Sequence, residues 1–255
     1  MPLHFTHRGS GEPVVLIHGL FGSLENVGGI ARLLSDEFHV YSVDLPNHGR
    51  SYHSDTFELE SIAADLAQWM TEQGIDSAHL VGHSLGGKAA MELALRYPSK
   101  IRSLVVLDIA PVKYQNRHVQ VFAGLQAVDL SKITQRREAD TVLQGYVDDA
   151  AVRSFLLKNL SKQKDGSFAW RMNLPSIARA YPDLIGPNVN ESSPSAALFV
   201  KGGDSDYIAE EHRAEILARF PNTQLKVVGN TGHWLHAEKP NVVARLIRNF
   251  VSDNV

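Results

Sequence analysis

Short apolar runs alternate with helical patterns along the first 111 residues, and this alternation constrains the fold more than any other feature. The runs PVVLIHG, HVYSVDLPNHG, SAHLVGHS and SLVVLDIAP have the length and β-branched content of buried strands. The segments between them, such as ELESIAADLAQWMTEQ, carry apolar residues at helical spacing. Repeated strand–helix–strand units predict an α/β fold whose mostly parallel sheet is covered by helices on both faces.

The alternation stops after Pro111 and resumes near residue 191. Residues 112–190 contain helical patterns, including VQVFAGLQAV and VRSFLLKNL, and one weak strand pattern, SFAWRMN. AALFVKGGDS and TQLKVVGN then restore the strand pattern, and KPNVVARLIRNFVSD predicts a closing helix. We therefore expect one core, residues 1–111 and 191–255, and a helical insertion at 112–190. Such an insertion emerges at the carboxyl ends of the strands, where open α/β sheets bind ligands.

The composition limits the chemistry of the chain. It has no cysteine, which excludes disulfides, thiolate catalysis and cysteine-ligated metals. Its net charge of -3, with both signs interspersed, gives no basic stripe for nucleic acid. The N-terminus lacks a signal-peptide pattern and no apolar run approaches the ~20 residues that span a bilayer, so we expect a cytoplasmic protein without stable membrane insertion. No histidine and carboxylate cluster has metal-ligand spacing, so we predict no metal and no cofactor.

The stretch VGHSLGG places Ser84 between a predicted strand and a predicted helix. Gly82-His83-Ser84-Leu85-Gly86 matches the pattern G-x-S-x-G of a nucleophilic serine on a sharp turn. Flanking glycines are needed because such a turn brings backbones close together and strains the central residue. A serine that only caps the helix is the alternative. The surrounding strand and helix patterns favour the nucleophile.

A serine nucleophile needs a base and donors for the developing oxyanion. His233, in GNTGHWLHAEKP, follows the predicted strand TQLKVV and would lie at the same edge of the sheet as Ser84. His236, three residues on, is the competing base. The turn HGLFGS after the first core strand predicts an oxyanion hole made by the backbone N–H groups of Leu20 and Leu85, with Phe21 as a further candidate donor.

Two aspartates compete to orient the histidine. Asp108, in SLVVLDIAP, and Asp204, in VKGGDSDY, both follow predicted strands and would lie at the carboxyl edge. A carboxylate among apolar strand residues is costly unless it is paired, which favours a partnered role for Asp108. Glycine and polar residues surround Asp204, and this pattern also fits a solvated turn. We favour Asp108 and keep Asp204 as the alternative, whereas Asp206 is a minor candidate and Asp44 is expected to hold its own loop.

The chain closely resembles the α/β-hydrolase superfamily through HGLFGS, DLPNHGRS, GHSLGG, LDIAP, GGDSDY and GHWLHAEKP, in this order. DLPNHGRS, GHSLGGKAAM, LDIAPVKY and GHWLHAEKP look like the YbfF-type esterases, which are related to the abhydrolase domain-containing 11 proteins. The resemblance implies an eight-stranded core, a helical cap inserted after the sixth strand, and cofactor-free hydrolysis of acyl esters or thioesters. It also implies that the position matching Asp204 is often asparagine, which supports Asp108.

The resemblance and the motifs together predict a serine hydrolase for a small-molecule acyl ester or thioester such as an acyl-CoA, acting as a monomer or a homodimer. A C–C bond hydrolase and a cofactor-free perhydrolase use the same three residues and remain alternatives. A non-catalytic binding protein on the same fold is the rival of another class.

Several residues are candidates for the substrate pocket. Core packing is the competing interpretation for the apolar ones, and Arg171 and Lys88 are candidates to meet an anionic group. The predicted pocket residues are His83, Trp234, Phe122, Phe155, Trp170 and Arg171. For His48 and Arg50, we prefer a salt bridge within the loop.

Overall fold

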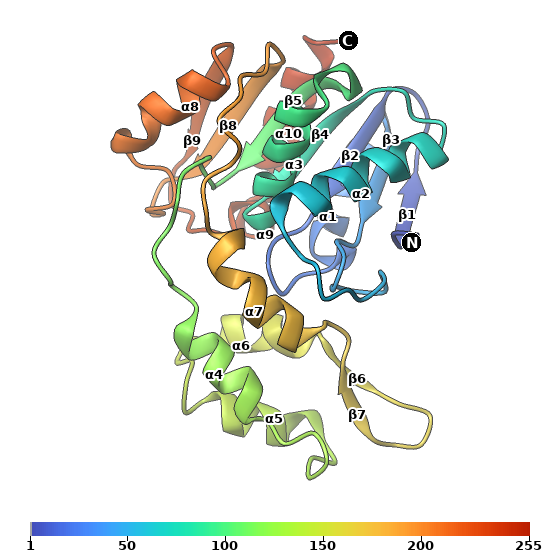
Figure 1. Cartoon of the computed structure of the whole chain (residues 1–255), viewed down its shortest axis with the longest axis vertical. Coiled ribbons are helices and arrows are strands. Elements are labelled where there is room, and N and C mark those ends of the chain that lie inside the picture. Colours follow the sequence, from blue (N-terminus) through green and yellow to red (C-terminus); the bar gives the residue numbers. More distant parts are fainter. Residues whose placement is uncertain (1) are drawn as a thin grey trace.

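The computed structural model describes residues 2–255, and its centre is a seven-stranded sheet in the spatial order β1-β3-β2-β4-β5-β8-β9 (Figure 1). β1 pairs antiparallel with β3, and all other neighbours in the sheet are parallel. The prediction of a mostly parallel sheet is confirmed. The strands are β1 (Phe5–Arg8), β2 (Pro13–Ile17), β3 (His39–Val43), β4 (Ala78–His83), β5 (Ile101–Leu107), β8 (Ala196–Gly202) and β9 (Thr223–Val228).

Helices cover both faces of this sheet. On one face, α1 (Leu24–Leu34) packs beside α10 (Pro240–Ser252), and their apolar residues share a core with Leu16 and Val105. On the other face, α2 (Leu59–Glu72) packs beside α3 (Leu85–Arg96). α8 (Arg213–Arg219) and the short α9 (Leu235–Glu238) complete the core. Strands β4 and β5 are buried along almost their whole length because both faces are covered.

Residues 112–190, here called the inserted segment, lie between β5 and β8 and extend away from one end of the sheet (Figure 1). They contain four helices and a two-stranded hairpin in which Leu160 pairs with Trp170. The elements are α4 (Val119–Ala127), α5 (Arg136–Leu143), α6 (Ala150–Leu157), β6 (Leu160–Lys162), β7 (Phe168–Trp170) and α7 (Leu174–Leu184).

The main sheet has one strand fewer than the resemblance implied. Six of its strands are the apolar runs of the sequence, and only β1 is added to them. Within residues 2–255, only β1 precedes β2 in the chain. The inserted segment therefore follows the fifth strand along the chain instead of the sixth.

A buried lysine joins the two linkers of the inserted segment to the core. Lys88, on α3, is 2% exposed. Its ammonium nitrogen donates to the carbonyl oxygen of Val112 at 2.6 Å and also to that of Gly186. The linkers also bond to each other, since the Tyr114 N–H donates to the Ile185 carbonyl at 2.8 Å. Both ends of the inserted segment are thus held against the helix that follows Ser84.

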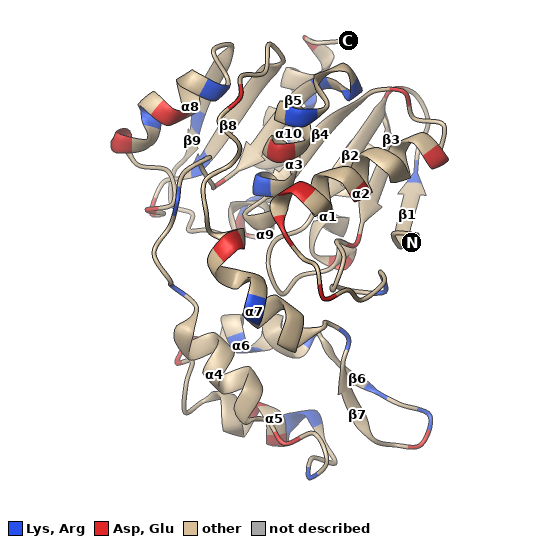
Figure 2. Ribbon diagram, viewed as in Figure 1, with Lys and Arg blue, Asp and Glu red and all other residues tan. Residues whose placement is uncertain are grey.

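Charged residues of both signs are scattered over the core and the inserted segment (Figure 2). This distribution agrees with the absence of a basic stripe in the sequence. Among residues 2–255, no helix combines the length and the apolar character needed to cross a bilayer.

Candidate active site

Ser84 lies on the turn between β4 and α3. Its backbone has φ 53° and ψ -119°, a conformation that costs energy for any residue with a side chain. The turn is possible because its neighbours lack side chains: a Cβ at Gly82 would collide with the Gly86 carbonyl, and one at Gly86 with the Ile17 carbonyl. The Ser84 hydroxyl makes no hydrogen bond within residues 2–255, and the residue lines a cavity.

His233 lies on the loop between β9 and α9, at the same edge of the sheet. Its Nδ1 is hydrogen bonded to Oδ2 of Asp108 at 2.8 Å, which leaves Nε2 as the free ring nitrogen. Asp108 follows β5, is fully buried and has φ 54°. Its Oδ1 accepts the Gly202 N–H at 2.9 Å, and its Oδ2 also accepts the Ser205 hydroxyl. These bonds satisfy the buried carboxylate and fix its direction toward His233.

The alternative acid and the alternative base lie apart from this pair. Asp204 is exposed, and its backbone N–H, not its carboxylate, bonds within the fold, to the Thr231 carbonyl. Asp206 is paired with Arg117. His236 is buried against the His83 ring at 4.2 Å, and burial lowers its pKa to about 4. Its Nδ1 has no partner within residues 2–255.

The turn HGLFGS and the turn that holds Ser84 each contribute one free backbone N–H group beside the serine, from Leu20 and Leu85. Leu85 is the first residue of α3, so its N–H has no partner inside the helix. The Leu20 N–H makes no hydrogen bond within the described residues, and Leu20 lines the same cavities as Ser84. The Phe21 N–H, in contrast, already donates to Nε2 of His48 at 3.2 Å. This leaves Leu20 and Leu85 as the candidate oxyanion donors.

His48 is therefore not part of a loop salt bridge, and our interpretation of it was wrong. It is fully buried, and its Nδ1–H donates to the Pro46 carbonyl at 3.0 Å, so Nε2 is left to accept the Phe21 N–H. Burial, and then the neighbouring His18, lower the pKa of His48 to about 3. A neutral His48 thus ties the loop after β3 to the turn after β2.

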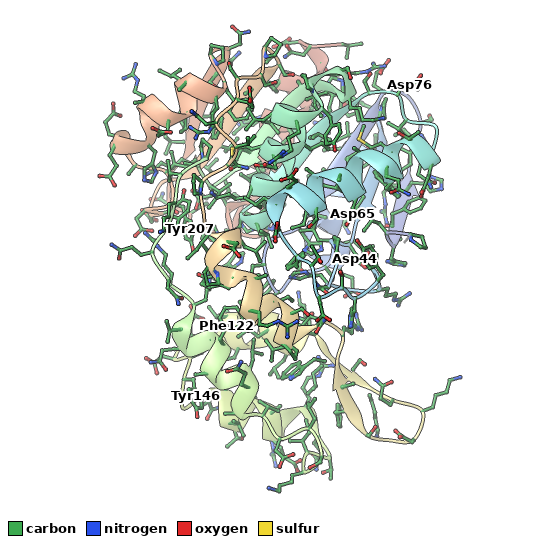
Figure 3. All side chains as sticks on the ribbon, viewed as in Figure 1. Asp44, Asp65, Asp76, Phe122, Tyr146 and Tyr207 are labelled. Carbon is green, nitrogen blue, oxygen red and sulfur yellow. The ribbon has the colours of Figure 1, made fainter. Side chains whose placement is uncertain are left out.

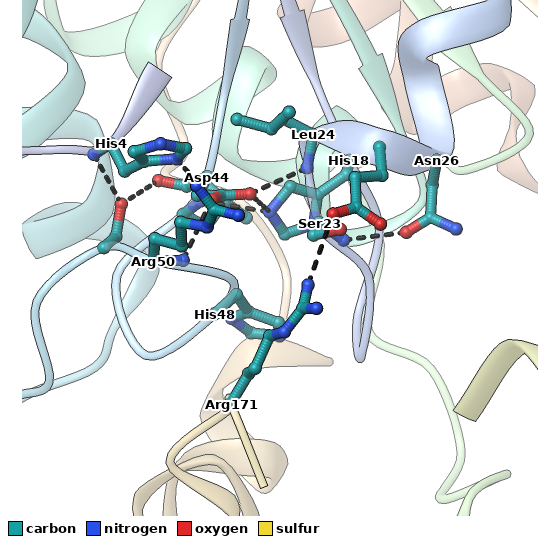
Figure 4. A network of polar contacts seen from close by, with 12 residues as sticks. His4, His18, Ser23, Leu24, Asn26, Asp44, His48, Arg50 and Arg171 are labelled. Atoms are coloured by element: carbon teal, nitrogen blue, oxygen red, sulfur yellow. Dashed lines mark hydrogen bonds and ion pairs between the residues drawn. The ribbon is translucent and has the colours of Figure 1, made fainter. Parts of the chain in front are cut away.

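Asp44 holds its own loop, as predicted, and it also bonds to the segment that follows β2 (Figure 4). Its Oδ1 accepts the Leu24 N–H at 2.7 Å, and its Oδ2 accepts the Arg50 N–H at 2.9 Å. Oδ2 also lies 2.8 Å from Nδ1 of His4. Arg50 therefore bonds through its backbone, and the loop DLPNHGRS serves to position the turn beside Ser84.

Two chambers meet at Ser84. The inner chamber, a narrow cavity of about 40 Å³, lies under the linkers of the inserted segment, and its wall includes Leu85, Lys88, Ile109, Tyr114, Leu184 and Ile185. The outer chamber, about 560 Å³, is bounded by residues including Val121, Val152, Phe155, Leu156, His233 and Trp234. Ser84, Leu20 and His118 line both. Sequence reasoning missed His118, because a single histidine ahead of a helix carries no distinguishing pattern.

The predicted pocket residues divide into two groups. His83, Phe155 and Trp234 line the outer chamber, and the His83 Nε2 bonds to the His233 carbonyl at 2.8 Å. The others lie outside both chambers. Phe122, on the inserted segment (Figure 3), packs on Phe21 with ring centroids 5.1 Å apart, Trp170 packs against the core, and Arg171 pairs with Glu25 at 3.2 Å.

A serine on a strained strand-to-helix turn, beside a histidine–aspartate pair at the carboxyl edge of a parallel sheet, is the arrangement of the α/β hydrolases. The comparisons agree: the chain matches the Alpha/beta hydrolase family over residues 14–246, and it belongs to that family. It is 40% identical to Esterase YbfF of Escherichia coli (strain K12) over 243 residues, which cover 95% of this chain and 94% of that protein.

Two further proteins resemble the chain over most of its length. One is the sn-1-specific diacylglycerol lipase ABHD11 of Xenopus laevis, 39% identical over 250 residues, or 94% of this chain and 80% of the lipase. The other is a solved structure titled Marine microorganism esterase, with a TM-score of 0.95 and 38% identity, covering 98% of this chain and 99% of that one. The predicted resemblance to YbfF-type esterases is confirmed.

Proposed function

We propose that this protein is a carboxylic ester hydrolase that works through an acyl-enzyme on Ser84. The observation that carries the proposal is the 2.8 Å bond from His233 to the buried Asp108, at the edge of the cavity that Ser84 lines. The names of the similar proteins, esterase and lipase, support the same class of reaction.

In the acylation step, the Ser84 oxygen attacks the ester carbonyl carbon and its proton passes to Nε2 of His233. Asp108 holds the ring through Nδ1, so Nε2 is the nitrogen that faces the reaction, and the carboxylate stabilises the imidazolium. The carbonyl oxygen becomes an oxyanion, which the N–H groups of Leu20 and Leu85 stabilise. The bond to the leaving oxygen then breaks, and His233 returns the proton to that oxygen.

In the second step, His233 takes a proton from water, and the hydroxide oxygen attacks the acyl-enzyme carbonyl. The bond to Ser84 breaks, the serine regains a proton from His233, and the acid leaves. A thioester would pass through the same steps with a thiol as the leaving group. The two charges that form in these steps are the oxyanion and the imidazolium. The N–H groups of Leu20 and Leu85 stabilise the first, and Asp108 stabilises the second.

Hydrolysis of p-nitrophenyl esters from acetyl to palmitoyl tests the proposal, with wild type and Ser84→Ala compared side by side. We expect turnover by the wild type and its loss in Ser84→Ala, whose thermal unfolding should match the wild type. Ser131→Ala is a matched control, since it also removes one serine hydroxyl but at an exposed position that lines neither chamber. Near wild-type turnover by Ser84→Ala would exclude this mechanism.

A further inference from the structure

We infer that His83 is a positioning residue for the base: its side chain holds the backbone of His233 and thereby keeps the imidazole of His233 beside Ser84. The inference rests on the proposed function, because it assigns a role within the same site. His83 is buried and is the last residue of β4, so it directly precedes the proposed nucleophile.

The contact that carries the inference joins a side chain to a main chain. Nε2 of His83 lies 2.8 Å from the carbonyl oxygen of His233. A carbonyl oxygen accepts hydrogen bonds and cannot donate them, so Nε2 of His83 must carry the proton of the neutral ring. The strand that leads to the nucleophile is therefore bonded directly to the residue that carries the base, 150 positions later in the chain.

The backbone of His233 has no other printed anchor of this kind. His233 lies on the loop between β9 and α9, and neither its N–H nor its carbonyl makes a backbone–backbone hydrogen bond within residues 2–255. Asp108 holds the ring through Nδ1 at 2.8 Å. A ring held at one atom can still pivot about that bond when its backbone shifts. The bond from His83 supplies the second fixed point.

The surroundings of His83 fix its ring in turn. Its centroid lies 4.2 Å from that of the His236 ring and 4.7 Å from that of the His233 ring. A Cβ at Gly19 would come within 3.0 Å of Nδ1 of His83, so the first glycine of HGLFGS leaves the room that this ring occupies. Burial, and then the neighbouring His236, lower the pKa of His83 well below its usual value, so the ring stays neutral.

Both steps of the proposed reaction depend on where Nε2 of His233 lies. Proton transfer needs its heavy atoms within hydrogen-bond reach, and a displacement of about 1 Å can cost about 10²-fold in rate. A His233 backbone released from His83 should therefore slow acylation and deacylation alike. Binding of the ester depends on the chamber walls, so KM should change little.

Two variants of His83 separate the hydrogen bond from the packing of the ring. His83→Phe keeps an aromatic ring of similar shape but has no N–H to donate. His83→Gln carries an amide N–H at a reach similar to that of Nε2, so it can restore the bond. On p-nitrophenyl butyrate, we expect kcat of His83→Phe to fall by about 10- to 100-fold with KM little changed, and His83→Gln to recover a large part of the loss.

His39→Phe is the matched control. It makes the same change at the amino end of β3, at the edge of the sheet opposite the site, and should keep the wild-type kcat. A wild-type kcat in His83→Phe, or an equal loss in His83→Phe and His83→Gln, would overturn the inference. A higher KM with unchanged kcat would also overturn it, because His83 would then act only as a wall of the outer chamber.

The His233→Ala background tests whether His83 acts through the base. This variant keeps the carbonyl that His83 contacts but has no imidazole to position. Adding His83→Phe to His233→Ala should therefore change the residual kcat by less than about twofold. If His83→Phe costs the same factor in both backgrounds, His83 acts independently of His233 and the inference fails.

A measurement on the wild-type protein covers the case in which His83→Phe does not fold. Proton–nitrogen NMR correlation with isotope-labelled histidine distinguishes the two neutral tautomers of a ring, and the His83 signals are assigned by their loss in His83→Gln. We expect the proton of His83 on Nε2 at neutral pH. A ring protonated on Nδ1 alone would have no donor for the His233 carbonyl and would overturn the inference.

The inference and the proposed function fail in different ways. Turnover that survives in Ser84→Ala would count against the proposed function, and with it against the role of His83. If Ser84→Ala is inactive while His83→Phe keeps the wild-type kcat, the positioning role alone is overturned and the hydrolase remains.

Discussion

Asp108 and His233 are 125 positions apart in the chain, and their side chains meet at 2.8 Å. Asp108 follows β5 and His233 follows β9, so the ends of two strands bring the pair together. The carboxylate is fully buried, and the Gly202 N–H and the Ser205 hydroxyl hold it in one orientation. His233 is thereby presented to the cavity in one tautomer.

The first prediction separates Asp108 from Asp204. Asp108→Asn keeps the size of the side chain but removes the charge that stabilises the imidazolium, so we expect kcat to fall by about 10³–10⁴-fold. Asp204→Asn is the matched control and should leave kcat near the wild-type value, because Asp204 is exposed. Steady-state kinetics on one p-nitrophenyl ester measures both, and a larger loss in Asp204→Asn would reverse the assignment.

The second prediction concerns His48, which positions the turn beside Ser84 by accepting the Phe21 N–H. His48→Leu removes this acceptor, so the Leu20 N–H should lose its alignment with the oxyanion. We expect kcat to fall by about tenfold or more with KM little changed, because the oxyanion exists only in the transition state.

A trifluoromethyl ketone distinguishes this role from a general loss of stability. Its adduct with Ser84 carries an oxyanion, so its inhibition constant should rise in parallel with the loss of kcat/KM in His48→Leu. His48→Gln, which can accept through its amide oxygen, should recover part of both quantities. Unchanged inhibition in His48→Leu would show that His48 does not act through the oxyanion donors.

The third prediction follows from Lys88. Burial lowers its pKa from 10.5 to about 7, and the neutral amine still has two N–H groups for the two linker carbonyls. Between pH 7 and 10.5, the unfolded chain therefore binds more protons at this position than the folded protein. The free energy of unfolding contributed by this site should rise with pH across that window.

Lys88→Met removes that pH-dependent contribution, so its free energy of unfolding should rise less steeply than that of the wild type between pH 7 and 10. Urea unfolding at a series of pH values measures the difference. Lys164→Met, on the exposed turn of the β6–β7 hairpin, is the control and should keep the wild-type slope. Parallel curves for the wild type and Lys88→Met would contradict the prediction.

Most of the sheet was predictable because six strands contain apolar runs bounded by turn residues, although β9 is an edge strand that is mostly exposed. β1 was not, since FTHR is a mostly exposed edge strand that carries no alternation of apolar and polar residues. For the β6–β7 hairpin, the sequence predicted only one weak strand, SFAWRMN, because three-residue strands are too short to show an alternation of apolar and polar residues. The tertiary pairing of Leu160 with Trp170 defines it.

The site was predictable where a local pattern reports a backbone constraint, as at Ser84. The pairing of His233 with Asp108 was harder to predict from the sequence, because Asp108 and Asp204 both follow strands at the same edge of the sheet. Only the three-dimensional course of the chain brings one of them to the imidazole. His48 is an example of a site residue that the sequence did not predict. Its burial depends on two loops packing together, and nothing in DLPNHGRS distinguishes it from an exposed turn residue.

The linkers of the inserted segment have a consequence for how such proteins diversify. The carbonyls of Val112 and Gly186 bond to one nitrogen atom, so the chain leaves the core and returns to it at nearly the same point. A segment with adjacent ends can be lengthened, shortened or exchanged without separating the strands on either side. Residues 112–190 could therefore be replaced as a unit. A different segment inserted between the same two points would change the chambers beside Ser84 and leave the catalytic residues of the core in place.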